Sequence, residues 1–384
     1  MRDIPPGLLE ELSALRRSLH AAAEPSGEER ETSAILLNFL RRFPGINLIH
    51  PLAETGLAAV FHSPQPGKTI LLRAEMDALP IPEATTLDYA SRNHTVSHKC
   101  GHDGHMAMLA GTAALLTENP PAQGSVQLLF QPSEENGCGA RKILADPLFP
   151  SIPPDFAFAL HCLPGFPLAT VILKEGLFAF ASSGFIAELR GVEAHAAEPE
   201  KGINPLRALV ELISHLNDPK NFIDEIQQGA KITIVYAKIG EKTFGTSPAA
   251  ATVMATLRAP SLKLLHQTID KYSVITNSIG QQYEIIVQTH AAEEFKPSIN
   301  HHQAVALVRK AAKCLNLKTV LLNQPFLWSE DFSRFLDFCP GALIGLGAGE
   351  NIPPLHHPDF DFPDELIEFG TLLNLQIAEC ALGE

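Results

Sequence analysis

Eight consecutive residues, His98 to His105, hold a dense group of metal-binding side chains: one thiol, three imidazoles and one carboxylate. A thiolate and an imidazole two positions apart, Cys100 and His102, can bind one divalent ion or two neighbouring ions. The glycines at 101 and 104 let the backbone turn sharply around them. Two ligands do not complete a metal site, so the others must come from elsewhere in the chain.

Further candidate ligands stand where short apolar segments end. The segments Thr69–Leu72, Val126–Phe130, Phe156–Leu160 and Ala342–Leu346 have the length and composition of buried strands. In a sheet of parallel strands, ligands gather outside the carboxyl ends of the strands. We therefore expect the polar residues that follow these segments to meet at one edge: Asp77, Glu134, Glu135, His161, His356 and His357.

The adjacent carboxylates Glu134 and Glu135 need not do the same work, because neighbouring side chains on extended backbone point to opposite sides. One can bind a metal ion while the other accepts a proton from water, whose pKa falls to about 7 at such an ion. A cysteine nucleophile at Cys100, paired with a histidine, is an alternative. That alternative leaves the glutamate pair and His356 without a role.

The order of the elements indicates two domains. Strands alternate with helices over residues 1–181 and again over 291–384, which predicts an α/β domain with a central sheet. Residues 182–290 read as strand, helix, strand, strand, helix, strand, the ferredoxin-like order. We therefore predict a discontinuous catalytic, metal-binding α/β domain with an inserted ferredoxin-like α+β domain.

Composition excludes several functions. The chain of 384 residues has 29 Lys and Arg against 43 Asp and Glu, a net charge of −14, which argues against nucleic acids and anionic membranes as partners. No uncharged apolar stretch of about 18 residues predicts a membrane span, and no secretory signal is recognisable. With six irregularly spaced cysteines, the expectation is a cytoplasmic protein with reduced thiols.

Several segments resemble motifs of the M20 metallopeptidase and amidohydrolase family, most of all its branch of aminoacylases, hippurate hydrolases and auxin-conjugate hydrolases. The resemblance lies in Arg73–Pro80, Cys100–His105, Gln131–Glu135 and Leu355–His356, and further in Gly191–Ala197, Ser329–Phe332 and Leu346–Gly349. It implies a dinuclear metal hydrolase whose inserted domain serves as a lid and for dimerisation. An exposed edge strand in such a small sheet also predicts a homodimer through the lid.

The resemblance further implies the roles of individual residues. Glu134 matches the general base, Asp77 the carboxylate that orients a ligand imidazole, and His195 a lid histidine that helps to hold the substrate carbonyl. The pattern Leu-His-x-Pro favours His356 over His357. Two divalent ions, each of which can be Zn²⁺, Mn²⁺, Co²⁺ or Ni²⁺, are then bound by Cys100, His102, Glu135, His161 and His356, with Cys100 as the bridge.

The implied activity is hydrolysis of the amide bond of N-acyl amino acids or related small conjugates. Alternatives are a dipeptidase, a carboxypeptidase or an N-acetyldiaminopimelate deacetylase of the same family, or a binding protein without catalysis. Some positions depart from the family pattern. Glu75 replaces an aspartate, Asn136 and Cys138 replace glycines, and Gly245–Pro248 replaces a segment whose asparagine helps to bind substrate.

Overall fold

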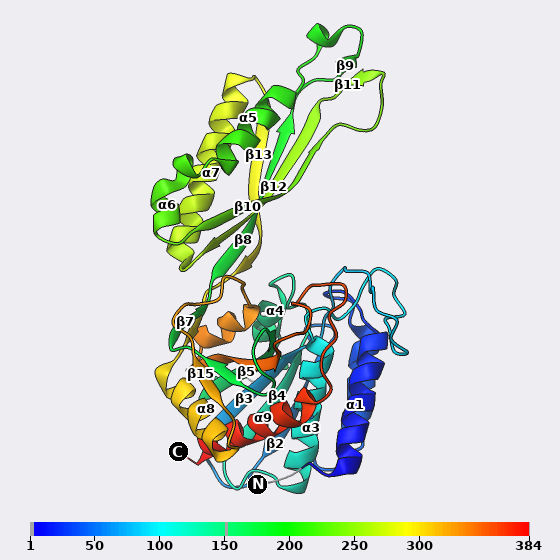
Figure 1. Cartoon of the computed structure of the whole chain (residues 1–384), viewed down its shortest axis with the longest axis vertical. Helices are drawn as coiled ribbons and strands as arrows, with labels where there is room; N and C mark the ends of the chain where they lie inside the picture. Colours follow the sequence, from blue (N-terminus) through cyan, green and yellow to red (C-terminus); the bar gives the residue numbers. More distant parts are fainter. Residues whose placement is uncertain (1–3, 150–152, 384) are drawn as a thin grey trace. The chain divides into compact units, whose positions relative to one another are not determined.

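The computed structural model describes residues 4–149 and 153–383 and divides into two compact units (Figure 1). Unit 1 comprises Met1–Phe178, Ser298–Pro325 and Glu330–Glu384, and unit 2 comprises Ala179–Pro297 and Phe326–Ser329. The insertion predicted at residues 182–290 falls inside unit 2. None of the described helices is long and apolar enough to cross a membrane.

Unit 1 is built on an eight-stranded sheet in the order β1-β2-β4-β3-β5-β16-β6-β15. Its four central strands, β4, β3, β5 and β16, run parallel, so their carboxyl ends meet at one edge. A two-stranded sheet pairs β7 with β14. The strands are β1 (Asn47–Leu52), β2 (Gly56–His62), β3 (Thr69–Glu75), β4 (Ser125–Gln131), β5 (Phe156–Pro164), β6 (Val171–Leu173), β7 (Gly176–Ala179), β14 (Ser298–Asn300), β15 (Thr319–Leu321) and β16 (Gly341–Gly349).

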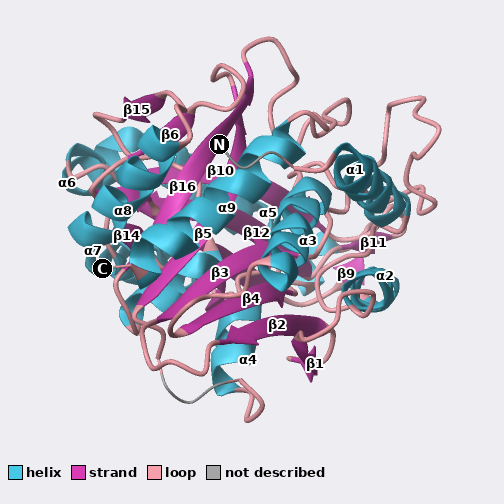
Figure 2. Cartoon of the chain, turned by 90° about the horizontal axis from the view of Figure 1, so that it is seen from below, coloured by secondary structure: helices cyan, strands magenta, loops and turns pink. Residues whose placement is uncertain are grey.

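Helices cover this sheet with apolar side chains. In Figure 2, α3 and α9 lie alongside β3, β4 and β5, and the two helices pack against each other. Nearly every residue of α3 is buried: most of the helix is apolar, and its first turn buries His102, Asp103 and His105. The helices are α1 (Pro6–Ala21), α2 (Arg30–Leu40), α3 (His102–Glu118), α4 (Gly139–Ala145), α8 (His302–Cys314), α9 (Leu366–Leu382) and the 3₁₀ helix η3 (Asp331–Asp337).

Unit 2 is an antiparallel sheet in the order β10-β12-β8-β13 with two long helices, α5 and α7, packed on it. Side chains of β8 alternate between buried and half-buried, which gives the sheet one apolar face. Its elements are β8 (Ala181–Arg190), β9 (Ala194–His195), η1 (Pro199–Lys201), α5 (Leu206–Asn217), η2 (Pro219–Phe222), α6 (Ile223–Gln227), β10 (Lys231–Ile239), β11 (Thr246–Ser247), β12 (Ala250–Ala259), α7 (Leu262–Gln282) and β13 (Ile286–Phe295).

The predicted fold class is confirmed: a discontinuous α/β domain with a ferredoxin-like insertion. Three strands of the eight-stranded sheet, β1, β6 and β15, were not predicted from the sequence. Pro51 within β1 argues against a strand in the sequence. The other two have only three residues each, too few to establish a period.

A buried charge network joins α1 to α3 behind the metal-binding segment. The carboxylate of Asp103 accepts hydrogen bonds from His20 Nδ1 at 2.8 Å and from Arg16 Nη1 at 3.3 Å. The Nε2 of His20 lies 3.1 Å from a Glu83 oxygen. Burial lowers the pKa of His20, but hydrogen bonds to Asp103 and Glu83 outweigh burial and raise the pKa to about 9.

We expect the His20→Leu substitution to flatten the pH dependence of stability. Native His20 keeps its proton up to about pH 9, whereas an unfolded histidine loses it near pH 6.5. The stabilisation is therefore complete below pH 6.5 and lost as the pH rises to 9. In urea denaturation, the parent's free energy of unfolding should fall up to about 1.4 kcal/mol per pH unit more steeply than the variant's. The exposed His62→Gln control should keep the parent's slope; equal slopes for parent and His20→Leu would contradict the assignment.

Candidate metal centre

Three of the predicted metal ligands lie together beside the carboxyl ends of β3 and β4. Ligand atoms of Cys100, His102 and Glu135 are all within 4.8 Å of one another. Gly101 joins the first two and has a φ of +84°. A Cβ at Gly101 would stand 2.5 Å from Cys162 Sγ, so both the turn and the close packing require glycine.

The other two predicted ligands adjoin this group. The Nε2 of His161, on β5, lies 3.5 Å from Cys100 Sγ. The Nε2 of His356, in the loop after β16, lies 3.9 Å from Glu135 Oε1. Backbone φ at His356 is +65°, and its N–H donates to the Lys99 carbonyl at 2.7 Å, which ties this loop to the segment before α3. Unit 1 thus brings all five predicted ligands together.

The adjacent histidine, His357, interacts within its own loop. Its Nδ1 accepts a hydrogen bond from the Asp359 N–H at 3.2 Å and lies 3.7 Å from the Asp359 carboxylate. The geometry therefore favours His356 over His357 as the partner of Glu135.

Two of the histidines, His102 and His161, are held in the tautomer that leaves Nε2 able to bind a metal ion. The Nδ1 atoms of His102 and His161 contact the backbone carbonyls of Asp77 at 2.8 Å and Cys162 at 2.9 Å. A carbonyl only accepts, so each Nδ1 carries the proton and each Nε2 keeps a lone pair. Burial lowers the pKa of His102 to about 4 and that of His161 to about 3. Both are neutral at pH 7 and offer Nε2 to a cation.

The charges of the group also fit a divalent ion. Within the described part of the chain, His102 Nε2 and Glu135 Oε1 are buried atoms without a hydrogen-bond partner. The pKa of Glu135 is raised mainly by burial and next by the charge of Asp77. The pKa of Cys100 is raised mainly by burial and next by the charges of Glu135 and Glu134. A cation would offset this repulsion and favour the thiolate. Mixed sulfur, nitrogen and oxygen donors suit the first-row divalent metals.

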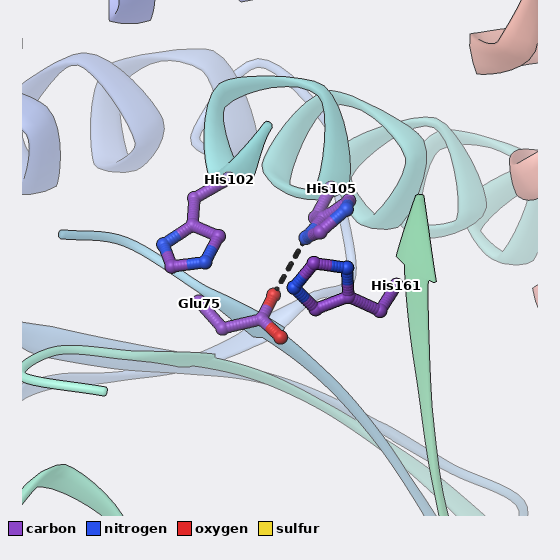
Figure 3. A group of neighbouring side chains, drawn as sticks. All are labelled: Glu75, His102, His105 and His161. Atoms are coloured by element: carbon purple, nitrogen blue, oxygen red, sulfur yellow. Dashed lines mark hydrogen bonds and ion pairs between the residues drawn. The ribbon is translucent and has the colours of Figure 1, made fainter. Parts of the chain in front are cut away.

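Another imidazole, His105, lies beside His102 and His161 (Figure 3). Its Nδ1 donates to Glu75 at 2.8 Å, and its Nε2 accepts from the Cys162 N–H at 2.9 Å. Both nitrogens are therefore engaged by the protein itself. His105 supports the backbone next to His161 and packs against that ring, with centroids 4.8 Å apart.

A buried guanidinium compensates the carboxylates on the other side of the site. Arg73 contacts Glu75, lies 3.0 Å from Glu330 Oε1 and lies 2.8 Å from Asp331 Oδ1. The prediction assigned no role to this group. The sequence does hint at this charged group, because Arg73, Glu75 and Asp77 alternate along β3 and just past its end, and therefore share one face of an extended chain. Glu330 lies far away in the sequence, and its signal is its place in the segment Ser329–Phe332, which resembles a family motif.

The structure corrects the predicted contact of Asp77. Its backbone carbonyl, not its carboxylate, binds His102 Nδ1; the nearer carboxylate oxygen is 3.8 Å away. The carboxylate instead accepts the backbone N–H groups of Glu134 at 3.0 Å and Glu135 at 2.9 Å, and the Ser26 hydroxyl at 2.6 Å. These three donors occupy the carboxylate. Asp77 therefore fixes the backbone of both glutamates.

The two glutamates have different surroundings, although they lie in a turn and not on the extended chain that the prediction assumed. Glu135 belongs to the group of Cys100 and His102, whereas Glu134 lies with Glu330 and Asp331. The backbone N–H of Asp331 donates to Glu134 Oε1 at 3.3 Å. Burial, then the charges of Glu330 and Glu135, raises the pKa of Glu134 well above its ordinary value.

The remaining predicted residue, His195, belongs to unit 2 and is not among the side chains that unit 1 brings together. It lies exposed on β9, where it pairs with Thr246 of β11. Its Nδ1 accepts a hydrogen bond from the Ala197 N–H at 3.0 Å. The proton of the neutral ring is therefore on Nε2.

Comparison with known proteins places these features in context. The family model described as Peptidase family M20/M25/M40 matches residues 71–379. N-acetyl-L-cysteine deacetylase of Bacillus subtilis strain 168 is 33% identical over 94% of this chain and 85% of that protein. Hippurate hydrolase of Campylobacter jejuni is 30% identical over 93% of each protein. The crystal structure of a dinuclear metal-binding M20 peptidase from Bacillus subtilis has a TM-score of 0.80 at 26% identity and covers 99% of both chains.

We expect metal removal to destabilise the protein. Because an ion that binds only the native state stabilises it by mass action, EDTA should lower the midpoint of thermal unfolding, and added Zn²⁺ or Mn²⁺ should restore it. Loss of a residue that hydrogen-bonds a metal ligand typically weakens metal binding by about 10- to 100-fold. Because His356 is a proposed ligand itself, His356→Asn should weaken metal binding by at least that factor. Metal titration followed by elemental analysis measures this effect. The matched His357→Asn variant should bind like the parent; the opposite result would exchange the two assignments.

Proposed function

Because this chain belongs to peptidase family M20/M25/M40, we propose that it is a metal-dependent amidohydrolase that cleaves N-acyl amino acids or related conjugates. The main support for the proposal is that the adjacent residues Glu134 and Glu135 have different neighbours. Glu135 faces the predicted ligands Cys100 and His102, while Glu134 stands beside them as a buried carboxyl group. This arrangement supplies a ligand and a base from adjacent residues.

We propose two divalent ions, held by Cys100, His102, Glu135, His161 and His356. When bound, such ions supply Lewis acidity that polarises an amide carbonyl and makes water a better nucleophile. Glu134 accepts a proton from the attacking water and returns it to the leaving amine. Asp77 and the Asp331 N–H keep Glu134 in place.

The substrate class is proposed from the named activities of two relatives. A deacetylase of N-acetyl-L-cysteine and a hydrolase of hippurate both act on N-acyl amino acids. In this chain we assign His195 as the donor to the substrate carbonyl. Its Nε2–H points away from the hydrogen bond that occupies Nδ1, which supports the assignment. The acyl group and the amino acid are left open.

We further propose that unit 1 is the catalytic domain and unit 2 the lid and dimerisation domain of a cytoplasmic homodimer. Strand β10 is an edge of the unit 2 sheet, and it exposes apolar side chains. Val235 is 57% exposed and Tyr236 is 44% exposed. An exposed edge strand can pair with strands of other proteins unless another element covers it. We propose that a second copy of this chain packs against the edge.

We expect Glu134→Gln to lower kcat on an N-acyl amino acid by about 100- to 10,000-fold, because the amide cannot accept the proton of water. The bound metal should remain, since Glu135 and the other proposed ligands are unchanged. Steady-state kinetics and elemental analysis measure the two effects. Glu118→Gln, an exposed change at the end of α3, is the control and should keep the parent rate. Normal turnover by Glu134→Gln would exclude Glu134 as the base.

Light scattering after size exclusion should give a mass about twice the 41.6 kDa of one chain. Val235→Lys places a charge on the exposed edge and should shift the protein towards the monomer at micromolar concentration. The exposed substitution Asn277→Lys on α7 has the same charge and should leave the dimer intact. A parent protein that elutes as a monomer would contradict the proposed assembly.

A further inference from the structure

Three consecutive backbone N–H groups, those of Ser133, Glu134 and Glu135, are each bound by a buried carboxylate. Asp77 accepts from the two glutamates, and the Oε1 of Glu29 accepts from Ser133 at 2.8 Å. Successive N–H groups in a turn of this kind form a concave site for anions. Here the protein fills that site with its own side chains.

Glu29 is held firmly in this position. It is fully buried in the loop before α2. Its Oε1 also accepts the Gly27 N–H at 2.7 Å, and its Oε2 accepts the Thr55 hydroxyl at 2.7 Å. Three donors from separate segments therefore converge on one carboxylate.

The residue that Glu29 binds has an unusual backbone conformation. The φ of Ser133 is +56°, a left-handed value that few residues other than glycine adopt. Such a conformation is disfavoured and persists only where surrounding contacts impose it. Ser133 directly precedes Glu134, so a change in its backbone angles would redirect the chain that carries the proposed base.

We propose that Glu29 is a positioning residue for Glu134. By binding the Ser133 N–H, it holds the left-handed conformation from which the Glu134 side chain takes its direction. Asp77 fixes the chain on the far side of the same turn. This inference rests on the proposed function, because it takes Glu134 to be the general base.

Glu29→Met tests the proposal, because methionine has similar length but accepts no hydrogen bond from Ser133. A displacement of the base by about 1 Å can cost about 100-fold in rate, so we expect a loss of that order in kcat per metal-loaded, folded chain. The KM should stay close to the parent value, since the Glu29 contacts named above are all within the protein. Glu29→Gln keeps an oxygen for both N–H groups and should restore most of the rate.

Glu24→Met is the matched control for simple destabilisation. Glu24 also accepts two backbone N–H groups near α2, those of Glu31 and Thr32, but does not contact Ser133. This variant should lose stability yet keep its kcat. If the Glu29→Met defect is fully explained by lost metal or unfolded protein, or if Gln restores nothing, the proposal is overturned.

Two further variants keep the test decisive. Thr55→Val removes only the hydroxyl that donates to Glu29 Oε2, so it should lower kcat by a smaller factor than Glu29→Met. This variant tests the proposal if Glu29→Met does not fold. Glu134→Gln is assayed in parallel. A full loss of rate in Glu134→Gln with normal kcat in Glu29→Met would refute the positioning role alone. Normal kcat in Glu134→Gln would refute the proposed base itself.

Discussion

The carboxylate of Asp77 is the interaction on which the proposed centre depends. It comes from the end of β3 and binds the backbone of the two glutamates that follow β4, while the carbonyl of the same residue orients His102. One residue therefore sets the position of the proposed base, a proposed carboxylate ligand and an imidazole. Since two of its three donors are backbone groups, the arrangement depends on how neighbouring strands pair as much as on side-chain identity.

Charge balance is the second constraint on this part of the molecule. Burial makes each carboxylate near the site costly, and their mutual repulsion adds to that cost. Arg73 compensates Glu75, Glu330 and Asp331 on one side. The group of Cys100, His102 and Glu135 offers sulfur, nitrogen and oxygen atoms, a donor set suited to divalent metal ions. Glu75 belongs to both parts, because it contacts Arg73 and also lies with His102, His105 and His161.

The sequence predicted those features that local pattern determines. Buried strands have a recognisable composition, and polar residues at their ends indicate an edge, so order alone predicts where candidate ligands gather. The choice of five ligands and of Glu134 as the base comes from the family resemblance. The role of Glu29 could not be found in this way, because it acts through contacts between segments far apart in the chain and a lone buried glutamate looks like any surface glutamate in sequence. Glu330 lies in a segment that resembles a family motif, but the sequence does not show that Arg73 is its partner. The contact of Asp77 was misjudged because a backbone carbonyl leaves no trace in residue identity.

The position of β16 in the sheet has a consequence for biosynthesis. This strand is the last of the large sheet to leave the ribosome, yet it lies between β5 and β6, which are made well over a hundred residues earlier. Until it arrives, the edge of β5 is unpaired and open to other chains. The nascent protein must therefore keep an unfinished, aggregation-prone sheet while unit 2 is translated.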